Sequence, residues 1–204
     1  MPRGVRTIVK DYASKIEAKL GVRPDWSKVL GCGSFGCVFG IPADERRVVK
    51  ISTDPTEGPV TKAIIESGLD KMLEGLVRFD DIWSLTLPRD RKAWVILREN
   101  VEPLQFPRMT RQGWEPALMT YNAKMRRAID HGLYSEKGPK TASDRAAGEK
   151  AASEAMTAIG ELYGYEATYM IAEALDELRN RVNVVLADIH MGNIGHRIYD
   201  WSEE

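Results

Sequence analysis

The chain has 204 residues, a formal net charge of −1, 43% hydrophobic residues and 29% charged residues. This composition is that of a globular protein with an apolar core, and the balanced charge argues against a dedicated nucleic-acid-binding protein, which would carry a basic face. No apolar run reaches the ~18 residues of a membrane helix, and the charged N-terminus lacks the apolar segment of a secretory signal, so we predict a cytoplasmic protein.

The first half of the chain has the pattern of a sheet accompanied by two helices. Residues 8–20 carry apolar side chains on one helical face, and Gly21 follows as a stop signal. After Pro59, residues 61–76 again show helical spacing and predict one continuous helix. Short β-rich runs predict five strands, the last two as a pair joined by a turn. These runs are 26–33, 36–41, 46–52, 81–87 and 93–99.

The second half is mostly helical. Apolar periodicity predicts helices near 115–132, 144–162 and 165–181, with an exposed loop at 134–143. The apolar stripe at 167–178 is expected to face a core rather than a partner protein. Residues 182–201 return to short strands and loops. The order predicts an α+β fold with a sheet-rich first half and a helical second half.

The two cysteines, Cys32 and Cys37, lie within a glycine-rich segment, residues 31–40. Their spacing is not the CxxC of a metal or redox site, and two cysteines do not make a disulfide framework. We therefore expect two small unpaired residues in a strand-turn-strand.

The glycine-rich segment GCGSFGCVFG is the first of four features that point to chemistry. Gly31, Gly33 and Gly36 form G-x-G-x-x-G, but a second β-type run follows instead of the helix that a dinucleotide-binding motif requires. This context favours a hairpin lying over nucleotide phosphates. Glycine is needed there because a side chain would hold the backbone N–H groups away from the phosphate oxygens. A plain glycine-rich β-turn is the alternative.

Lys50 and an acidic residue on the following helix are the second and third features. Lys50 lies between Val49 and Ile51 in a predicted strand, and burying an unpaired ammonium group is costly. An alternating strand that exposes Lys50 to solvent is the other interpretation. Glu66 is the predicted carboxylate partner, and Glu74 is its competitor on the same predicted helix.

The fourth feature is LADIHMGNIG, with Asp188 and Asn193 five residues apart, followed by Asp200. Together, the four features resemble the protein-kinase-like superfamily in order and spacing, over roughly residues 26–201. The D-x-H-x-G-N text is similar to aminoglycoside and choline phosphotransferases, and G-x-G-x-F-G-x-V is similar to protein kinases.

The resemblance implies a role for each matching residue. Lys50, held by Glu66, contacts the α- and β-phosphates of ATP, and Asp188 orients the acceptor hydroxyl and takes its proton. Asn193 and Asp200 hold Mg²⁺, whose preferred ligands are hard oxygen atoms. The glycine segment covers the nucleotide, and the backbone of the segment RENV binds adenine. These cofactor-binding positions are Gly31, Gly33, Ser34, Phe35, Gly36, Val38, Lys50, Glu99 and Val101.

The implied fold is a kinase-like two-lobed fold. Residues 1–100 are the small lobe, with a five-stranded antiparallel sheet and one main helix, and 101–204 are a truncated helical large lobe. Leu186 and Ala187 replace the His-Arg of protein kinases, and only seven residues separate Asn193 from Asp200. The resemblance implies an ATP- and Mg²⁺-dependent phosphotransferase. Its acceptor, a protein Ser/Thr or small-molecule hydroxyl, and its oligomeric state stay open.

Two other classes of function fit parts of the sequence. A pseudokinase would bind nucleotide without turnover and act through a protein partner. A metal-dependent enzyme would use Asp188, His190, His196 and Asp200 as ligands for Zn²⁺ or Fe²⁺, but their spacing matches no established metal motif and leaves the glycine segment without a role.

Overall fold

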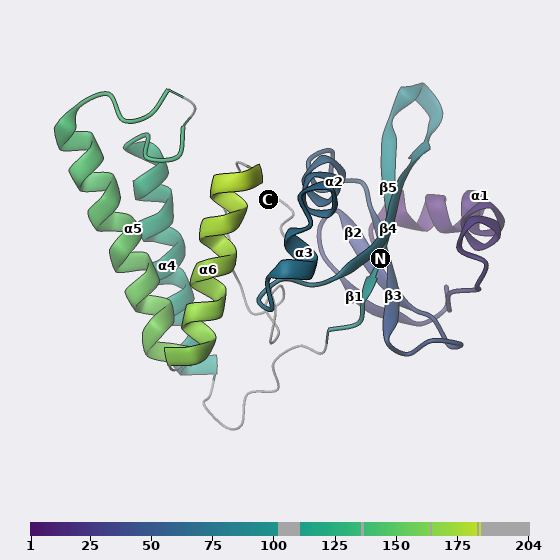
Figure 1. Ribbon diagram of the computed structural model, residues 1–204. Helices are drawn as coiled ribbons and strands as arrows, with labels where there is room; N and C mark the ends of the chain where they lie inside the picture. The colour runs from purple at the N-terminus through teal and green to yellow at the C-terminus, as the bar shows by residue number, and fades with distance from the viewer. Residues whose placement is uncertain (102–110, 136, 164, 183, 185–204) are drawn as a thin grey trace. The chain divides into compact units, whose positions relative to one another are not determined.

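The computed structural model describes residues 1–101, 111–135, 137–163, 165–182 and 184 (Figure 1). Tertiary contacts divide the chain into a sheet unit, residues 1–70 and 77–100, and a helical unit that contains 71–76 and the described residues from 101 onward. The elements are, in chain order, α1 (Arg3–Leu20), β1 (Val29–Cys32), β2 (Gly36–Gly40), β3 (Arg47–Ser52), α2 (Glu57–Ser67), α3 (Leu69–Met72), β4 (Phe79–Thr86), the 3₁₀ turn Pro88–Asp90, β5 (Lys92–Glu99), α4 (Arg111–Asp130), α5 (Ala142–Tyr163) and α6 (Tyr165–Val182).

The sheet unit is built on five antiparallel strands in the order β1-β2-β3-β5-β4. The five predicted strands and their antiparallel arrangement are therefore confirmed, and the fold is mixed, with helices following the sheet. β3 is central and pairs with both β2 and β5, so that Lys50 has Val38 and Ile96 as its cross-strand neighbours. β1 is an edge strand, and all four of its residues are exposed.

Alternation along the strands gives the sheet two different faces. On one face, α1 packs through Val5, Ile8 and Ile16, which are fully buried, and Gly21 ends this helix in the left-handed conformation with φ 68°. The opposite face carries Lys50, which contacts Glu57 of α2. Figure 1 shows α2 and α1 on opposite sides of the sheet. The strand residues that share the α1 core are Cys37, Phe39, Val49, Ile51, Leu85, Ala93, Val95 and Leu97.

The start of α2 packs unusually close to the sheet. A Cβ atom on Gly58 would lie 1.9 Å from Cδ2 of Trp94 on β5, so only glycine fits at this position. Pro59, in the first turn, has no N–H group to lose from the helical ladder. This contact sets the distance between the first turn of α2 and the strands below it.

Replacing Gly58 by alanine should therefore destabilise the sheet unit. Overpacking of this kind costs about 1–3 kcal/mol, because the rigid indole of Trp94 must move. The matched control is Gly31→Ala, since an added Cβ there meets no described atom within 4 Å. Urea unfolding followed by tryptophan fluorescence measures the difference. Equal midpoints for the two variants would contradict the close contact.

The prediction of one continuous helix over 61–76 was wrong. The helix begins earlier, at Glu57, and ends at Gly68, whose φ of 72° and N–H bond to the carbonyl of Ile65 form a left-handed cap. A separate short helix, α3, follows. Glu74 therefore lies beyond both helices and is exposed.

The helical unit contains the three predicted helices, at Arg111–Asp130, Ala142–Tyr163 and Tyr165–Val182. The small buried residues Ala151, Ala155 and Ala158 of α5 allow this helix to pack closely against α4. On α4, Tyr121 is fully buried, and its burial raises the pKa of its hydroxyl. Ala174 and Leu178, the described end of the predicted stripe on α6, are also fully buried. This part of the stripe faces a core, as predicted.

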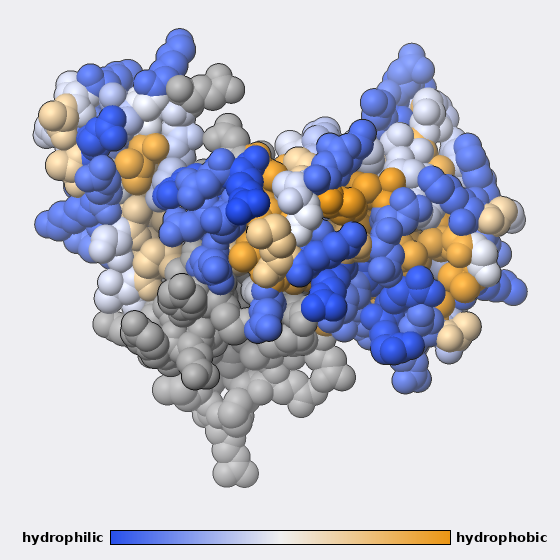
Figure 2. Space-filling model, in the orientation of Figure 1, coloured by the Kyte–Doolittle hydropathy of each residue, from blue (hydrophilic) through white to orange (hydrophobic). Residues whose placement is uncertain are grey.

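Among the described residues, no helix combines the length and apolar character needed to cross a membrane. Figure 2 shows hydrophobic residues in small areas between hydrophilic ones on the visible face. The exposed large apolar side chains include Leu30 and Phe35, both in or next to the β1-β2 hairpin.

Candidate functional site

Lys50 forms a buried ion pair on the α2 face of the sheet. Its side chain is 5% exposed, and Nζ lies 2.5 Å from Oε1 of Glu57, which is 4% exposed. The alternative in which a polar strand face exposes Lys50 to solvent is therefore excluded. The ammonium group is paired with a carboxylate inside the sheet unit.

The predicted partner, Glu66, is not the residue that holds Lys50. Glu66 is 66% exposed and pairs with Lys62 at 3.6 Å on the surface of α2. It follows Glu57 by nine residues, which is about two and a half turns of an α-helix, so the two side chains lie on opposite faces. The prediction failed because it started the helix after Pro59, whereas Glu57 occupies its first position. The signal was present in the sequence, since proline is common in the first turn of helices.

Polar groups around Glu57 are buried together at the N-terminal end of α2. The Asp54 carboxylate accepts hydrogen bonds from the N–H and hydroxyl groups of Thr56, both at 2.7 Å, and the Asp54 N–H donates to the Ser52 hydroxyl. Asp54 and Glu57 each keep one buried carboxylate oxygen without a hydrogen-bond partner among the described residues. Two acidic groups are thus placed at the positive end of the helix dipole.

The three glycines of the β1-β2 hairpin have different surroundings. A Cβ atom on Gly36 would lie 2.9 Å from the carbonyl oxygen of Ile51 and 3.3 Å from Cε of Lys50. Gly36 is thus required by the close approach of β3, and the Lys50 stem passes beneath it. At Gly31 and Gly33, an added Cβ would meet no described atom within 4 Å, and neither residue needs a positive φ. The fold of the sheet unit does not require glycine at these two positions.

The tip of the hairpin is anchored to the end of β3. The carbonyl of Phe35 accepts hydrogen bonds from the N–H and the hydroxyl of Thr53, at 2.8 and 2.9 Å, and the Gly33 N–H closes the turn on Gly36. The N–H groups of Ser34 and Phe35 have no hydrogen-bond partner within the described part of the chain. Two donors are therefore available at a fixed tip.

Cys32 and Cys37 form a disulfide between β1 and β2 at the residue pair next to the turn, with their Cα atoms 4.1 Å apart. The expectation of two unpaired cysteines was wrong. The strand-turn-strand itself is as predicted, but its register places the two residues directly opposite each other. Spacing alone does not show this, because the conformation of the turn between Cys32 and Cys37 sets which residues pair.

Leu30 was missed by the sequence analysis. Its side chain is 48% exposed and lies over Gly40, where a Cβ would be 3.6 Å away. Val38, which pairs with Lys50 and is half-buried, is the predicted apolar residue of β2 on the Lys50 face. The signal available in the sequence was a leucine directly before Gly31, the first glycine of the G-x-G-x-x-G segment.

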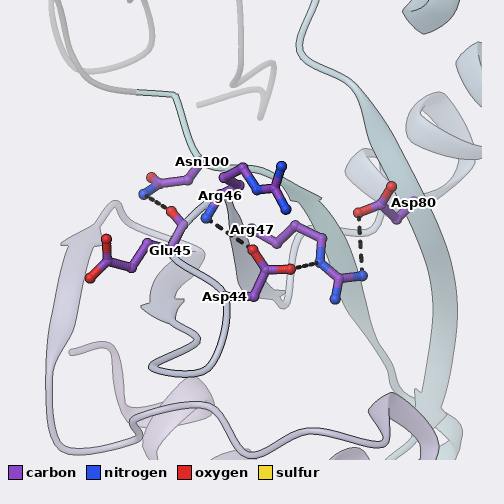
Figure 3. Close-up of polar contacts among 6 residues, drawn as sticks. All are labelled: Asp44, Glu45, Arg46, Arg47, Asp80 and Asn100. Carbon is purple, nitrogen blue, oxygen red and sulfur yellow. Dashed lines mark hydrogen bonds and ion pairs between the residues drawn. The ribbon is translucent and has the colours of Figure 1, made fainter.

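The end of β5 is braced against the turn before β3 (Figure 3). The side-chain amide of Asn100 donates to the carbonyl of Glu45 at 2.9 Å, and its backbone N–H donates to Arg46. Within the turn, the hydrogen bond from Arg47 holds the pKa of the Asp44 carboxyl below its usual value. The N–H of Glu99 is bonded to the carbonyl of Arg78, so a contact between the Glu99 backbone and adenine would use its carbonyl group. Val101 ends the described segment and is buried.

Three predicted site residues, Asp188, Asn193 and Asp200, lie outside the described residues, as do His190 and His196. Within the described ranges, no group of three or more His, Cys, Asp or Glu side chains could hold a metal ion. The described part of the site therefore consists of the glycine hairpin, Lys50 and Glu57.

Comparisons with known proteins add little to this geometry. No protein-family model and no curated protein sequence matches the chain. Among solved structures, the chain is similar to one described as WaaP in complex with acyl carrier protein, at 12% sequence identity and a TM-score of 0.34. That match covers 80% of this chain and 92% of the other.

Proposed function

We propose that the protein binds ATP and Mg²⁺ and transfers the γ-phosphoryl group to a hydroxyl of a protein or a small molecule. The observation that carries this proposal is the buried Lys50–Glu57 pair beneath the glycine hairpin. Each of its parts has a task in holding phosphate groups.

The buried pair is better explained by ligand binding than by stability. Desolvating two charges costs several kcal/mol per ion, and apolar replacements of buried ion pairs are often neutral or stabilising. The aliphatic part of Lys50 passes under Gly36, and Glu57 pairs with its ammonium group. These two contacts fix the position of the positive charge. That is what phosphoryl transfer needs, because positioning and charge neutralisation supply most of the catalysis.

The backbone of the hairpin suits the binding of a nucleoside triphosphate. The open space at Gly31 and Gly33 leaves room for phosphate oxygens to approach the backbone, and the N–H groups of Ser34 and Phe35 are available as donors. Leu30 and Val38 supply apolar side chains for an adenine ring, and the segment containing Glu99 and Val101 supplies backbone groups for its polar edge. The proposal therefore assigns residues of the hairpin and of the segment after β5 to the two ends of ATP.

The remaining roles are carried by residues outside the described ranges. Asp188 would position the acceptor hydroxyl and take its proton, and Asn193 and Asp200 would provide oxygen ligands for Mg²⁺. When bound, Mg²⁺ neutralises charge on the β- and γ-phosphates. The role proposed for Glu66 passes to Glu57.

The test compares the native protein with Glu57→Gln and Glu66→Gln. Loss of the Glu57 charge misplaces the Lys50 ammonium, and a misplacement of about 1 Å can lower turnover by ~10²-fold. Glu66→Gln should leave turnover unchanged, because an exposed pair such as Lys62–Glu66 contributes only about 0.3–0.5 kcal/mol. Calorimetric titration with Mg·ATP and transfer from labelled ATP, including autophosphorylation, measure binding and turnover. Thermal unfolding of both variants checks that they fold.

Three results would count against the proposal. Equal effects of the two variants would show that the buried pair has no special role. Absence of Mg·ATP binding by the native protein would reject the function itself. Binding without transfer to any acceptor or to water would favour a nucleotide-binding protein that acts without catalysis.

A further inference from the structure

The Cys32–Cys37 disulfide joins the edge strand β1 to the rest of the sheet. β1 pairs with β2 alone, and its four residues are all exposed, so little apolar burial holds it in place. Cys37, in contrast, is 1% exposed and belongs to the core beneath α1. The disulfide is thus a covalent link between a weakly held strand and a buried strand.

The two sulfur atoms differ in access. Cys32 lies on the exposed strand, whereas Cys37 is enclosed by the α1 core. A reductant can therefore reach the bond from the Cys32 side. The disulfide lies on the α1 face of the sheet, opposite the face of Val38 and Lys50, so that exchange need not disturb the buried ion pair.

We propose that Cys32–Cys37 is a reversible redox site that controls the order of the glycine hairpin. A thiolate of a dithiol reductant attacks Sγ of Cys32, the Sγ–Sγ bond breaks, and Cys37 leaves as a thiolate that takes up a proton. The second thiol of the reductant then attacks the mixed disulfide, which forms the oxidised reductant and releases Cys32 as a thiol. Two electrons pass from the dithiol to the protein, and a disulfide oxidant reverses the reaction.

The oxidised state is the ordered state of the hairpin. With the disulfide closed, β1 stays paired to β2, and the N–H groups of Ser34 and Phe35 keep their positions on the tip held by Thr53. After reduction, β1 is held mainly by its ladder with β2 and opens more often. A ligand that needs the hairpin must then order it, which weakens binding.

The consequence for the nucleotide rests on the function proposed above. If the hairpin covers the phosphates, we expect oxidised protein to bind Mg·ATP about 5- to 10-fold more tightly than reduced protein, because only the fraction of reduced protein with an ordered hairpin is competent to bind. The hairpin amides of β1 and the tip exchange about ten-fold faster after reduction, whether or not nucleotide binds.

The experiment uses the full-length protein with and without dithiothreitol. Alkylation and mass determination should count no free thiol before reduction and two after it. Hydrogen exchange of residues 29–36 and the Kd of Mg·ATP are then measured in both states. The variant Cys32→Ser leaves the buried Cys37 in the core and cannot close the bridge. It should match reduced protein in both measurements, with and without dithiothreitol.

The outcomes separate this proposal from the proposed function. Unchanged hydrogen exchange and unchanged Kd on reduction, or a Kd that falls, would overturn the redox site. A Cys32→Ser variant that still responds to dithiothreitol would also overturn it. Faster exchange on reduction, with no Mg·ATP binding in either state, would support the redox control of the hairpin and reject the nucleotide function.

Discussion

Replacing Lys50 by methionine should abolish Mg·ATP binding and also lower the free energy of unfolding by about 3–5 kcal/mol. The loss of stability follows because Glu57, 4% exposed, would keep a buried carboxylate without the ammonium group that neutralises it. The loss of binding follows because the fixed positive charge beneath the hairpin would be gone. The single variant therefore does not separate the loss of stability from the loss of binding. Both members of the Lys50–Glu57 pair have to be replaced.

The double variant Lys50→Met with Glu57→Gln separates them. It removes both charges while nearly keeping the side-chain volumes, so most of the lost stability should return. Mg·ATP binding should stay absent. Chemical denaturation measures the first quantity, and calorimetry measures the second. A double variant that regains stability and still binds Mg·ATP with native affinity would show that Lys50 is only part of the fold.

Asp188→Asn should lower phosphoryl transfer by ~10²-fold or more, the scale of general acid–base contributions, with Mg·ATP affinity near that of the native protein. The asparagine keeps the size and hydrogen-bonding capacity of the aspartate but loses its charge and basicity. An interaction that acts only in the transition state affects turnover and leaves ground-state binding largely unchanged. Transfer from labelled ATP beside a calorimetric Kd measures both quantities.

A matched variant for this measurement is Asp130→Asn, which makes the same chemical change at an exposed position at the end of α4. It should transfer phosphate at the native rate. Robust transfer by Asp188→Asn would remove this residue from the proposed mechanism, and an equal loss in both variants would point to a general effect of the substitution.

Most of the helices and strands could be predicted from local sequence patterns. Local patterns that act within a few residues predict the strand rich in Val and Ile around Lys50 and the first helix, which ends at Gly21. They also predict the three later helices. The glycine hairpin and a lysine in an apolar strand were also visible, because residue type and spacing carry that information directly. The break at Gly68 was missed because it lies inside otherwise continuous helical spacing.

Which residues contact one another depends on the packing of the elements and could not be predicted from local patterns. Glu57 rather than Glu66 reaches Lys50, because the start of the helix sets which face turns toward the strands, and nine residues reverse that face. Gly58 is required because Trp94, on a strand far along the chain, occupies the space of its side chain. Cys32 meets Cys37 because the register of β1 and β2 aligns them. Each of these contacts depends on how separate elements are positioned in space. Residue spacing within one element does not specify those positions.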